Sequence, residues 1–210
     1  MNAVVELTVE ELHFLAAAHG VSAVPGLGPL PTDEAALDLL AGTAARSLVG
    51  RGLGIYLGDE FLLASELIPL FDVYEDPDSV VSAERWSEDE RGLRTWTTRG
   101  DDVVELMQLS GGFYALSALA PDDVPARLAD FLELTGDDDG EGALEQIDVP
   151  ATAVLVDARR VGRRDDFVEG IALEWVDLGD GGRVWVLGSD PERVLATPTG
   201  RGRVLAQLAT

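Results

Sequence analysis

The sequence predicts an α+β fold in which an antiparallel β-sheet is flanked by helices. Three observations lead to this prediction. Apolar residues recur at helical spacing in the first part of the chain, between clear start and stop signals. Residues 79–119 then change to the alternation typical of strands. The end of the chain repeats a strand, proline and helix pattern found earlier, which a pseudo-two-fold arrangement of two halves would explain.

Length and composition favour one domain with a substantial core. The chain has 210 residues, of which 46% are hydrophobic, so it lies outside the composition range of disordered proteins. We expect residues 1–210 to form a single α+β domain with two sub-halves. The first, about 1–135, holds helices, a β-meander and a further helix, and the second, 146–210, holds strands and a C-terminal helix. An acidic stretch at 136–145, expected to be a mobile loop, joins them.

The charge and the missing residue types exclude several classes of function. A net charge of -24 argues against binding to nucleic acid or to an anionic membrane, and suits either a soluble carrier or generic solubility. The chain has no cysteine and no lysine, which excludes thiolate metal sites, Schiff-base lysines and P-loop lysines. The start of the sequence does not resemble a signal peptide and no apolar run could cross a bilayer, so we expect a cytoplasmic protein.

The first 80 residues predict three helices. Thr8 and Glu11 have the spacing of a capping box, and Gly20 lies where a helix would end. A second helix is expected from Thr32-Asp33-Glu34 to Gly50, and a third over 60–71. Three short helices also resemble the start of a winged-helix domain. The few basic residues in 1–80, only Arg46 and Arg51, argue against DNA binding.

An antiparallel meander is predicted next. Its four strands are Val80–Trp86, Leu93–Thr98, Asp102–Leu109 and Phe113–Leu119. Their connections are too short to hold a crossover helix, so neighbouring strands should run antiparallel. The polar connection Ser87–Gly92 joins the first two strands. Pro121 then opens a helix that carries Leu128 and Leu132.

The second half of the chain is predicted to repeat this order of strands followed by a helix. Residues 154–161 fit a strand or a short helix equally well. Strands are expected at Phe167–Leu178, Arg183–Leu187 and Arg193–Thr197, with a tight turn at 179–182 and a helix at the C-terminus. The stretch 115–132 has a shortened counterpart at 193–209. Either a pseudo-two-fold fold or coincidence between two ordinary strand-to-helix units explains the likeness.

Candidate residues for catalysis or metal binding are few. His13 and His19 lie six residues apart on one predicted helix, about 120° around its axis, which is not the spacing of a zinc helix. We expect His19 to interact with the C-terminus of that helix. The acidic stretch Asp137–Glu141 departs from the calcium-loop pattern. The basic cluster Arg159, Arg160, Arg163 and Arg164 fits either an acidic partner or the chain's own carboxylates. We therefore predict no catalytic, cofactor-binding or metal-binding residues and no cofactor.

Several segments, in order, resemble the EspG chaperones associated with ESX (type VII) secretion in actinobacteria. The segments are Leu7-Thr8-Val9-Glu10-Glu11-Leu12, Thr32-Asp33-Glu34, Ala44-Ala45-Arg46-Ser47-Leu48-Val49-Gly50-Arg51-Gly52-Leu53, Ala126-Arg127-Leu128-Ala129-Asp130-Phe131-Leu132 and Val149-Pro150-Ala151. The resemblance implies an antiparallel sheet flanked by helical bundles and a cytosolic chaperone that binds the tip of a PE–PPE-type heterodimer. It also implies contact through a loop between early strands and through a helical bundle in the second half.

The resemblance indicates where a partner would bind. The matching loop gives seven candidate partner-binding residues: Trp86, Ser87, Glu88, Asp89, Glu90, Arg91 and Trp96. Residues 147–167 leave little room for the second-half bundle. The sequence thus predicts a non-catalytic protein-binding module, a chaperone for type VII-secreted substrates. The first alternative is an acidic immunity or inhibitor protein that blocks a toxin. An enzyme that uses only carboxylates and arginine is the remaining hypothesis.

Overall fold

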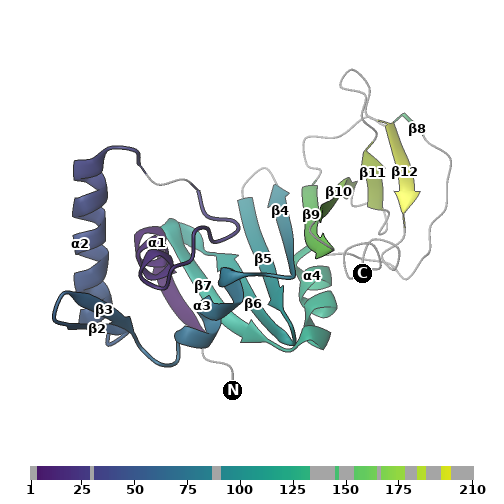
Figure 1. Cartoon of the computed structure of the whole chain (residues 1–210). Coiled ribbons are helices and arrows are strands. Elements are labelled where there is room, and N and C mark those ends of the chain that lie inside the picture. The colour runs from purple at the N-terminus through teal and green to yellow at the C-terminus, as the bar shows by residue number, and fades with distance from the viewer. Residues whose placement is uncertain are drawn as a thin grey trace. The chain divides into compact units, whose positions relative to one another are not determined.

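The computed structural model describes eight stretches of the chain: residues 4–28, 31–86, 91–132, 145–146, 154–164, 167–177, 184–187 and 195–199 (Figure 1). The chain divides into two compact units, each formed by two separate stretches of sequence. The first unit comprises residues 1–78 and 95–119, and the second comprises 79–94 and 120–210. The halves expected on either side of residues 136–145 stay a prediction. No helix among the described residues has the length and hydrophobicity to span a bilayer.

The sheet of the first unit has the strand order β1-β7-β6-β5. Its strands are β1 (Val5–Thr8), β5 (Arg91–Arg99, whose last five residues belong here), β6 (Asp102–Gln108) and β7 (Phe113–Leu119). Strand β1 pairs antiparallel with β7, so that Val5 lies opposite Leu116, and β7 pairs antiparallel with β6. Sequence reasoning missed β1, because four residues are too few for alternation to stand out. A 3-10 turn at Ser110–Gly112 links β6 to β7.

Helix α1 (Val9–Ala18) begins with the predicted capping box. The Thr8 hydroxyl accepts a hydrogen bond from the Glu11 backbone N–H at 3.2 Å, and the Thr8 backbone N–H donates to Glu11 Oε2 at 3.0 Å. Two of the otherwise unpaired backbone donors at the helix start are satisfied in this way. The helix ends at His19, and Gly20 follows with a φ of 82°, as predicted for a left-handed residue after a helix.

Helix α2 (Glu34–Gly50) also agrees with the prediction. Asp33 caps it by accepting a hydrogen bond from the Ala36 backbone N–H at 2.9 Å. Its C-terminal end is marked by Gly52, whose φ is 73°. Its buried residues are few and small, apart from Leu48, and the rest of the helix is exposed or partly exposed.

The third helix predicted at 60–71 is wrong in extent. The chain instead forms a hairpin of β2 (Gly54–Leu57) and β3 (Glu60–Leu63), and only then helix α3 (Ile68–Glu75). Gly58 has a φ of 66° and, with Asp59, makes the two-residue turn of the hairpin. A short apolar run fits either a helix or a strand by periodicity, and the Gly-Asp turn was the signal that distinguishes them.

The core of the first unit lies between its helices and one face of its sheet. Large side chains with less than 2% of their surface exposed come from β1, α1, α2, α3, β6 and β7: Leu7, Leu12, Leu15, Leu48, Phe71, Leu106 and Leu116. Helices α1 and α2 contact each other, and α3 contacts β6 and β7. This packing buries Leu12, Leu15 and Leu48, which are apolar residues at helical spacing in the sequence.

The second unit has the strand order β5-β4-β9-β10-β11-β12-β8. Its elements are β4 (Ser79–Trp86), the start of β5, a 3-10 turn at Pro121–Asp123, α4 (Val124–Leu132), β8 (Glu145–Gln146), β9 (Val154–Arg164), β10 (Phe167–Asp177), β11 (Val184–Leu187) and β12 (Leu195–Thr199). Residues 154–161 are therefore strand. Glu145, expected in the acidic loop, begins β8. The rest of that loop, the turn at 179–182 and the C-terminal helix lie outside the described residues.

The strand order repeats itself along the chain. The strands β4-β5-β6-β7 are neighbours in sequence order and β1, which precedes them in the chain, lies beside β7. In the same way β9-β10-β11-β12 are neighbours and the preceding strand β8 lies beside β12. Strands β4 and β9, the first of each series, pair antiparallel, with Val81 opposite Arg160. The pseudo-two-fold arrangement of the two halves stays a prediction.

Candidate functional site

The connection between β4 and β5 is where the sequence predicted a partner-binding loop. Strand β4 ends at Trp86 and β5 begins at Arg91, so the connection is residues 87–90, shorter than the expected Ser87–Gly92. Ser87, Glu88, Asp89 and Glu90 lie outside the described residues, as does the side chain of Trp86. Of the seven candidate residues, only Arg91 and Trp96 have described side chains.

Arg91 lies at the base of this connection. Its Nη2 donates to Glu84 Oε2 at 2.8 Å, and the arginine side chain is 65% exposed. An exposed ion pair of this kind contributes only a few tenths of a kcal/mol to about 1 kcal/mol of stability. Its more useful effect is to hold together the two strands that carry residues 87–90. The pair also neutralises the one basic side chain next to the acidic residues of the connection.

Trp96 does not lie on a surface. Its side chain is 1% exposed, and its neighbours Thr95 and Thr97 are fully buried. Three consecutive buried residues mean that β5 is covered on both faces at this point, which the alternation of a half-exposed strand did not predict. The Thr95 hydroxyl donates to the Pro25 carbonyl at 3.4 Å, so the connector after α1 lies over one of these faces. Trp96 therefore positions β5 by packing and is not itself available to a partner.

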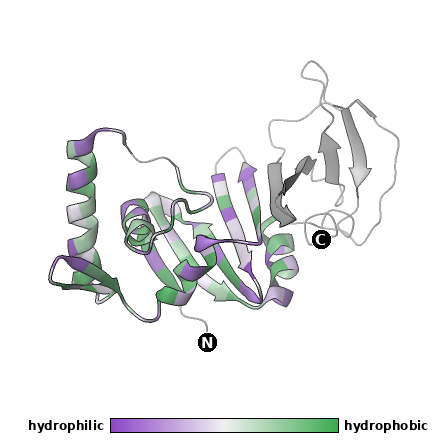
Figure 2. Ribbon diagram, in the orientation of Figure 1, coloured by the Kyte–Doolittle hydropathy of each residue, from purple (hydrophilic) through white to green (hydrophobic). Residues whose placement is uncertain are grey.

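The hairpin β2–β3 is an exposed apolar surface that sequence reasoning missed. Ile55, Tyr56 and Leu57 are 60%, 52% and 68% exposed, and hydrophobic residues continue along β3 (Figure 2). Among the described residues the two strands form a separate two-stranded sheet. The Phe61 ring meets the rings of Phe14 and Tyr56 edge-to-face, at centroid distances of 4.8 and 5.3 Å, which fixes the base of the hairpin. The apolar side chains of β2 are left in solvent.

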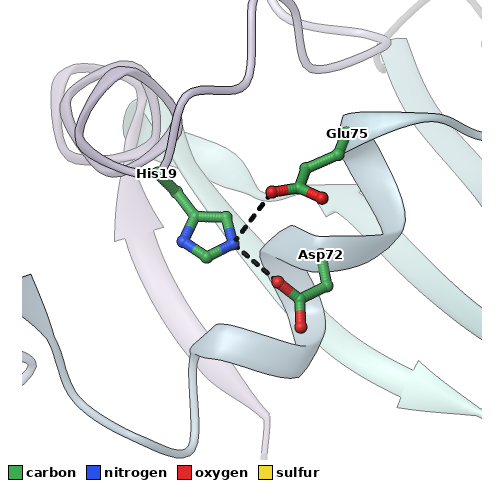
Figure 3. Close-up of side chains that lie close together, drawn as sticks. All are labelled: His19, Asp72 and Glu75. Atoms are coloured by element: carbon green, nitrogen blue, oxygen red, sulfur yellow. Dashed lines mark hydrogen bonds and ion pairs between the residues drawn. The ribbon is translucent and has the colours of Figure 1, made fainter.

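A cluster of charged groups joins α1 to α3. His19 Nε2 lies 2.7 Å from Asp72 Oδ1 and 3.8 Å from Glu75 Oε1 (Figure 3). We expected the His19 side chain to interact with the C-terminus of its own helix, and this prediction is wrong. The imidazole instead points to α3, because two carboxylates attract it more strongly than the partial charge of a helix end does. Arg99 donates to Glu75 Oε2 at 3.3 Å and to the backbone carbonyl of Asp72.

His13, the other histidine, makes an exposed contact. Its Nε2 lies 3.0 Å from the carbonyl oxygen of Gly28, on the connector that follows α1. The two histidines therefore have different surroundings, although His13 lies on α1 and His19 directly follows that helix.

Tyr74 has a structural role in the core of the first unit. Burial raises the pKa of the Tyr74 hydroxyl far above its ordinary value, and the nearby polar side chain of Thr97 offsets only part of that rise. Tyr74 is 4% exposed and belongs to the main hydrophobic cluster. A neutral phenol buried among apolar side chains stabilises packing and has no access to a substrate.

The basic cluster found in the sequence lies on β9. Arg159 and Arg160 are opposite Ser82 and Val81 of β4, and Arg163 is opposite Val168 of β10. The side chains of these residues lie outside the described part of the chain, as does the whole of the acidic stretch Asp137–Glu141. The sequence-based expectations for both segments stay predictions.

Comparison with solved structures gives a clear likeness in fold. No protein-family model and no curated protein sequence matches the chain. The fold is similar to that of the Mycobacterium tuberculosis type VII secretion system chaperone EspG5, solved in complex with a PE25–PPE41 dimer. The TM-score is 0.61 at 14% sequence identity, and the match covers 99% of this chain and 94% of that chain. At this identity the likeness shows the fold: an α+β protein with an antiparallel sheet and helices, as in EspG5.

Proposed function

We propose that this chain is a non-catalytic protein-binding module, a cytosolic chaperone for type VII-secreted substrates of the PE–PPE kind. The observation that carries the proposal is the likeness to EspG5 over 99% of this chain, because EspG5 is a type VII secretion chaperone solved in complex with a PE25–PPE41 dimer. The likeness is one of fold, and folds host more than one function. The sequence pattern described above adds support from a separate source.

The proposed contact surface is the connection between β4 and β5. It carries three acidic residues in succession, Glu88, Asp89 and Glu90, and the nearest arginine, Arg91, is already paired with Glu84. A partner would therefore present basic or hydrogen-bond-donating groups at the contact. Complementary charges of this kind speed association and select the partner, more than they add affinity. Trp96 is buried within β5 and is left out of the proposed contact surface.

The strongly negative net charge of this chain suits a carrier protein. At -24 the chain repels its own copies and stays soluble while it holds a substrate that would otherwise associate. The same charge favours the alternative function, an acidic immunity or inhibitor protein that covers the basic active site of a toxin. The two candidates differ in the partner: a helical heterodimer for the chaperone, and a toxin enzyme for the inhibitor.

Co-expression of the full chain with helical secreted pairs encoded beside its gene tests the chaperone function. The expected result is a soluble complex of one chain with one heterodimer on size exclusion, and a pair that precipitates when expressed without the chain. Affinity purification from the native cytosol with mass spectrometry supplies the independent arm. Recovery of a toxin as the stoichiometric partner would replace the chaperone proposal with the inhibitor.

Two matched double variants test whether the β4–β5 connection is the contact surface. Glu88→Arg with Glu90→Arg reverses two charges on the β4–β5 connection, and Asp59→Arg with Glu60→Arg reverses two at the tip of the β2–β3 hairpin. Both changes raise the net charge equally. We expect the first pair to weaken the complex at least tenfold and the second to change the affinity less than threefold. Equal effects would show that only the net charge matters and that the contact lies elsewhere.

A further inference from the structure

His19, Asp72 and Glu75 bring one imidazole and two carboxylates together across two helices. His19 is the residue that ends α1, and Asp72 and Glu75 are three positions apart on α3, so they project from the same side of that helix. One ligand atom from each residue lies within 4.8 Å of the others. In Figure 3 both carboxylates point toward the same imidazole nitrogen, Nε2. We propose that these three residues form a binding site for a divalent transition-metal ion of the zinc type.

The donor set fits that class of ion. Zinc is bound by histidine nitrogen and carboxylate oxygen at about 2.0–2.2 Å, so neighbouring ligands of a tetrahedral site lie about 3.4 Å apart. The Nε2–Oε1 separation of 3.8 Å is close to this spacing. The Nε2–Oδ1 separation of 2.7 Å is that of a hydrogen bond, and it has to widen by less than one ångström when an ion replaces the shared proton. With three protein ligands the fourth position is left to water.

Surrounding residues hold the ligands in this orientation. The His19 ring packs edge-to-face on Phe71, with 6.3 Å between centroids, and Phe71 is fully buried. Arg99 holds the Oε2 atom of Glu75, which leaves Oε1 turned toward the imidazole, and it also holds the carbonyl of Asp72. Outer contacts of this kind commonly fix metal-binding carboxylates and histidines. The positive charge of Arg99 offsets part of the negative charge, so we expect a site of moderate affinity.

An ion can reach the proposed site because its three side chains are partly exposed to solvent. The side chain of His19 is 18% exposed, and those of Asp72 and Glu75 are 47% and 45% exposed. The cluster is thus reachable from solvent without opening the core. The imidazole distinguishes it from the many carboxylates elsewhere in this acidic chain, because the soft-to-borderline nitrogen ligand selects zinc over calcium and magnesium.

The chain offers a matched control, because it has only two histidines and no cysteine. His19→Gln removes the proposed ligand, whereas His13→Gln removes a histidine whose Nε2 contacts the Gly28 carbonyl. Glu75→Gln keeps the shape of the side chain and weakens a second ligand. Circular dichroism of each variant establishes that it remains folded, so that lost binding is not mistaken for unfolding.

The test is a titration of the full chain with zinc chloride in a calorimeter, together with thermal melts in zinc and in magnesium. We expect one saturable zinc site per chain and a melting temperature that rises with zinc and not with equimolar magnesium. His19→Gln should lower the zinc affinity at least tenfold, Glu75→Gln should lower it several-fold, and His13→Gln should leave it unchanged. Cobalt(II) should give the visible absorption of a four-coordinate site in the parent and lose it in His19→Gln.

Two outcomes would overturn the proposal. Zinc binding that is absent or unsaturable in the parent would mean that the three residues form an ion pair only. Saturable binding that survives His19→Gln would place the ion among carboxylates elsewhere in the chain. Neither outcome bears on the protein partner, whose test is the separate co-expression experiment.

Discussion

Arg51 Nη1 donates to Glu11 Oε2 at 2.7 Å and so joins the end of α2 to the start of α1. The same carboxylate oxygen accepts the Thr8 backbone N–H, so one atom serves both the helix cap and the ion pair. Glu11 is 1% exposed, whereas the Arg51 side chain is 40% exposed. Arg51 also donates to the backbone carbonyl of Glu6 in β1. A strand and two helices therefore meet at a single buried charge.

Replacement of Arg51 by Met should destabilise the fold by about 2 kcal/mol. The change leaves the buried Glu11 carboxylate without its cation, which is costlier than loss of a surface pair, although the exposure of Arg51 reduces the effect. Urea unfolding measures it. Arg46→Met, an exposed arginine on the same helix, is the control and should change stability by about 0.5 kcal/mol or less. Equal losses in the two variants would contradict a special role for the Arg51–Glu11 pair.

Gly54 should not tolerate a side chain. A Cβ atom at this position would lie 2.3 Å from the Phe61 ring and 2.9 Å from the Leu62 carbonyl oxygen. Gly54→Ala should therefore cost about 1–3 kcal/mol, because the ring that anchors the hairpin has to move. Gly50→Ala, at the end of α2 with nothing within 4 Å, should instead be neutral or stabilise by up to about 1 kcal/mol. Thermal melts of the two variants, compared side by side, test the prediction.

Tyr74 should make the fold sensitive to alkaline pH. Its pKa in the folded state is raised by burial, so the stabilisation that it contributes is fully present below the unfolded pKa of about 10 and is lost as pH rises above that value. The unfolding free energy should fall by about 1.4 kcal/mol per pH unit in this window.

The comparison variants for this prediction are Tyr74→Phe and Tyr56→Phe. Tyr74→Phe should lose the slope above pH 10, because it removes the buried hydroxyl that titrates. Tyr56 is 52% exposed, and its replacement should leave the slope as in the parent. Denaturant unfolding at pH 9, 10 and 11 gives the three slopes. A Tyr74→Phe slope equal to that of the parent would assign the alkaline sensitivity to other groups.

Phe131 should stabilise the start of β5 within the second unit. The Arg94 guanidinium lies over its ring at 5.0 Å from the centroid, and a Cβ at Gly92 would come within 3.1 Å of the same ring. Phe131→Ala removes the ring on which Arg94 lies and leaves space beside Gly92, and it should cost about 2–3 kcal/mol. Phe113→Ala, at a phenylalanine that is 45% exposed, is the control and should cost less than half as much. Urea unfolding followed by tryptophan fluorescence measures both losses, and equal values would contradict the prediction.

Local sequence patterns predicted the elements whose signals lie within a few residues. The capping box at Thr8 and Glu11 and the cap at Asp33 satisfy helix-end donors three positions away, so no distant contact is needed to form them. The four meander strands were predicted for the same reason, since alternation is read directly from neighbours. The helix placed at 60–71 was wrong because a short apolar run between turns has no decisive period.

The candidate sites were predicted less well, because they depend on contacts across long separations. The sequence placed Trp96 beside the partner-binding connection, but the burial of Trp96 depends on elements that cover both faces of β5. His19 and Asp72 are 53 positions apart, and Arg51 and Glu11 are 40 apart. No periodicity links such residues, so the metal-type cluster and the buried ion pair were invisible from sequence.

The sequence by itself determined the acidic character of the chain, its lack of thiol and amine nucleophiles, its α+β class and the ends of its first two helices. These follow from composition and from interactions between residues less than about five positions apart. Only the tertiary structure decided which side chains are buried, which distant charges meet and that the strand order repeats. The physical reason is that packing and charge pairing act through space, and the path of the chain between two residues sets whether they meet.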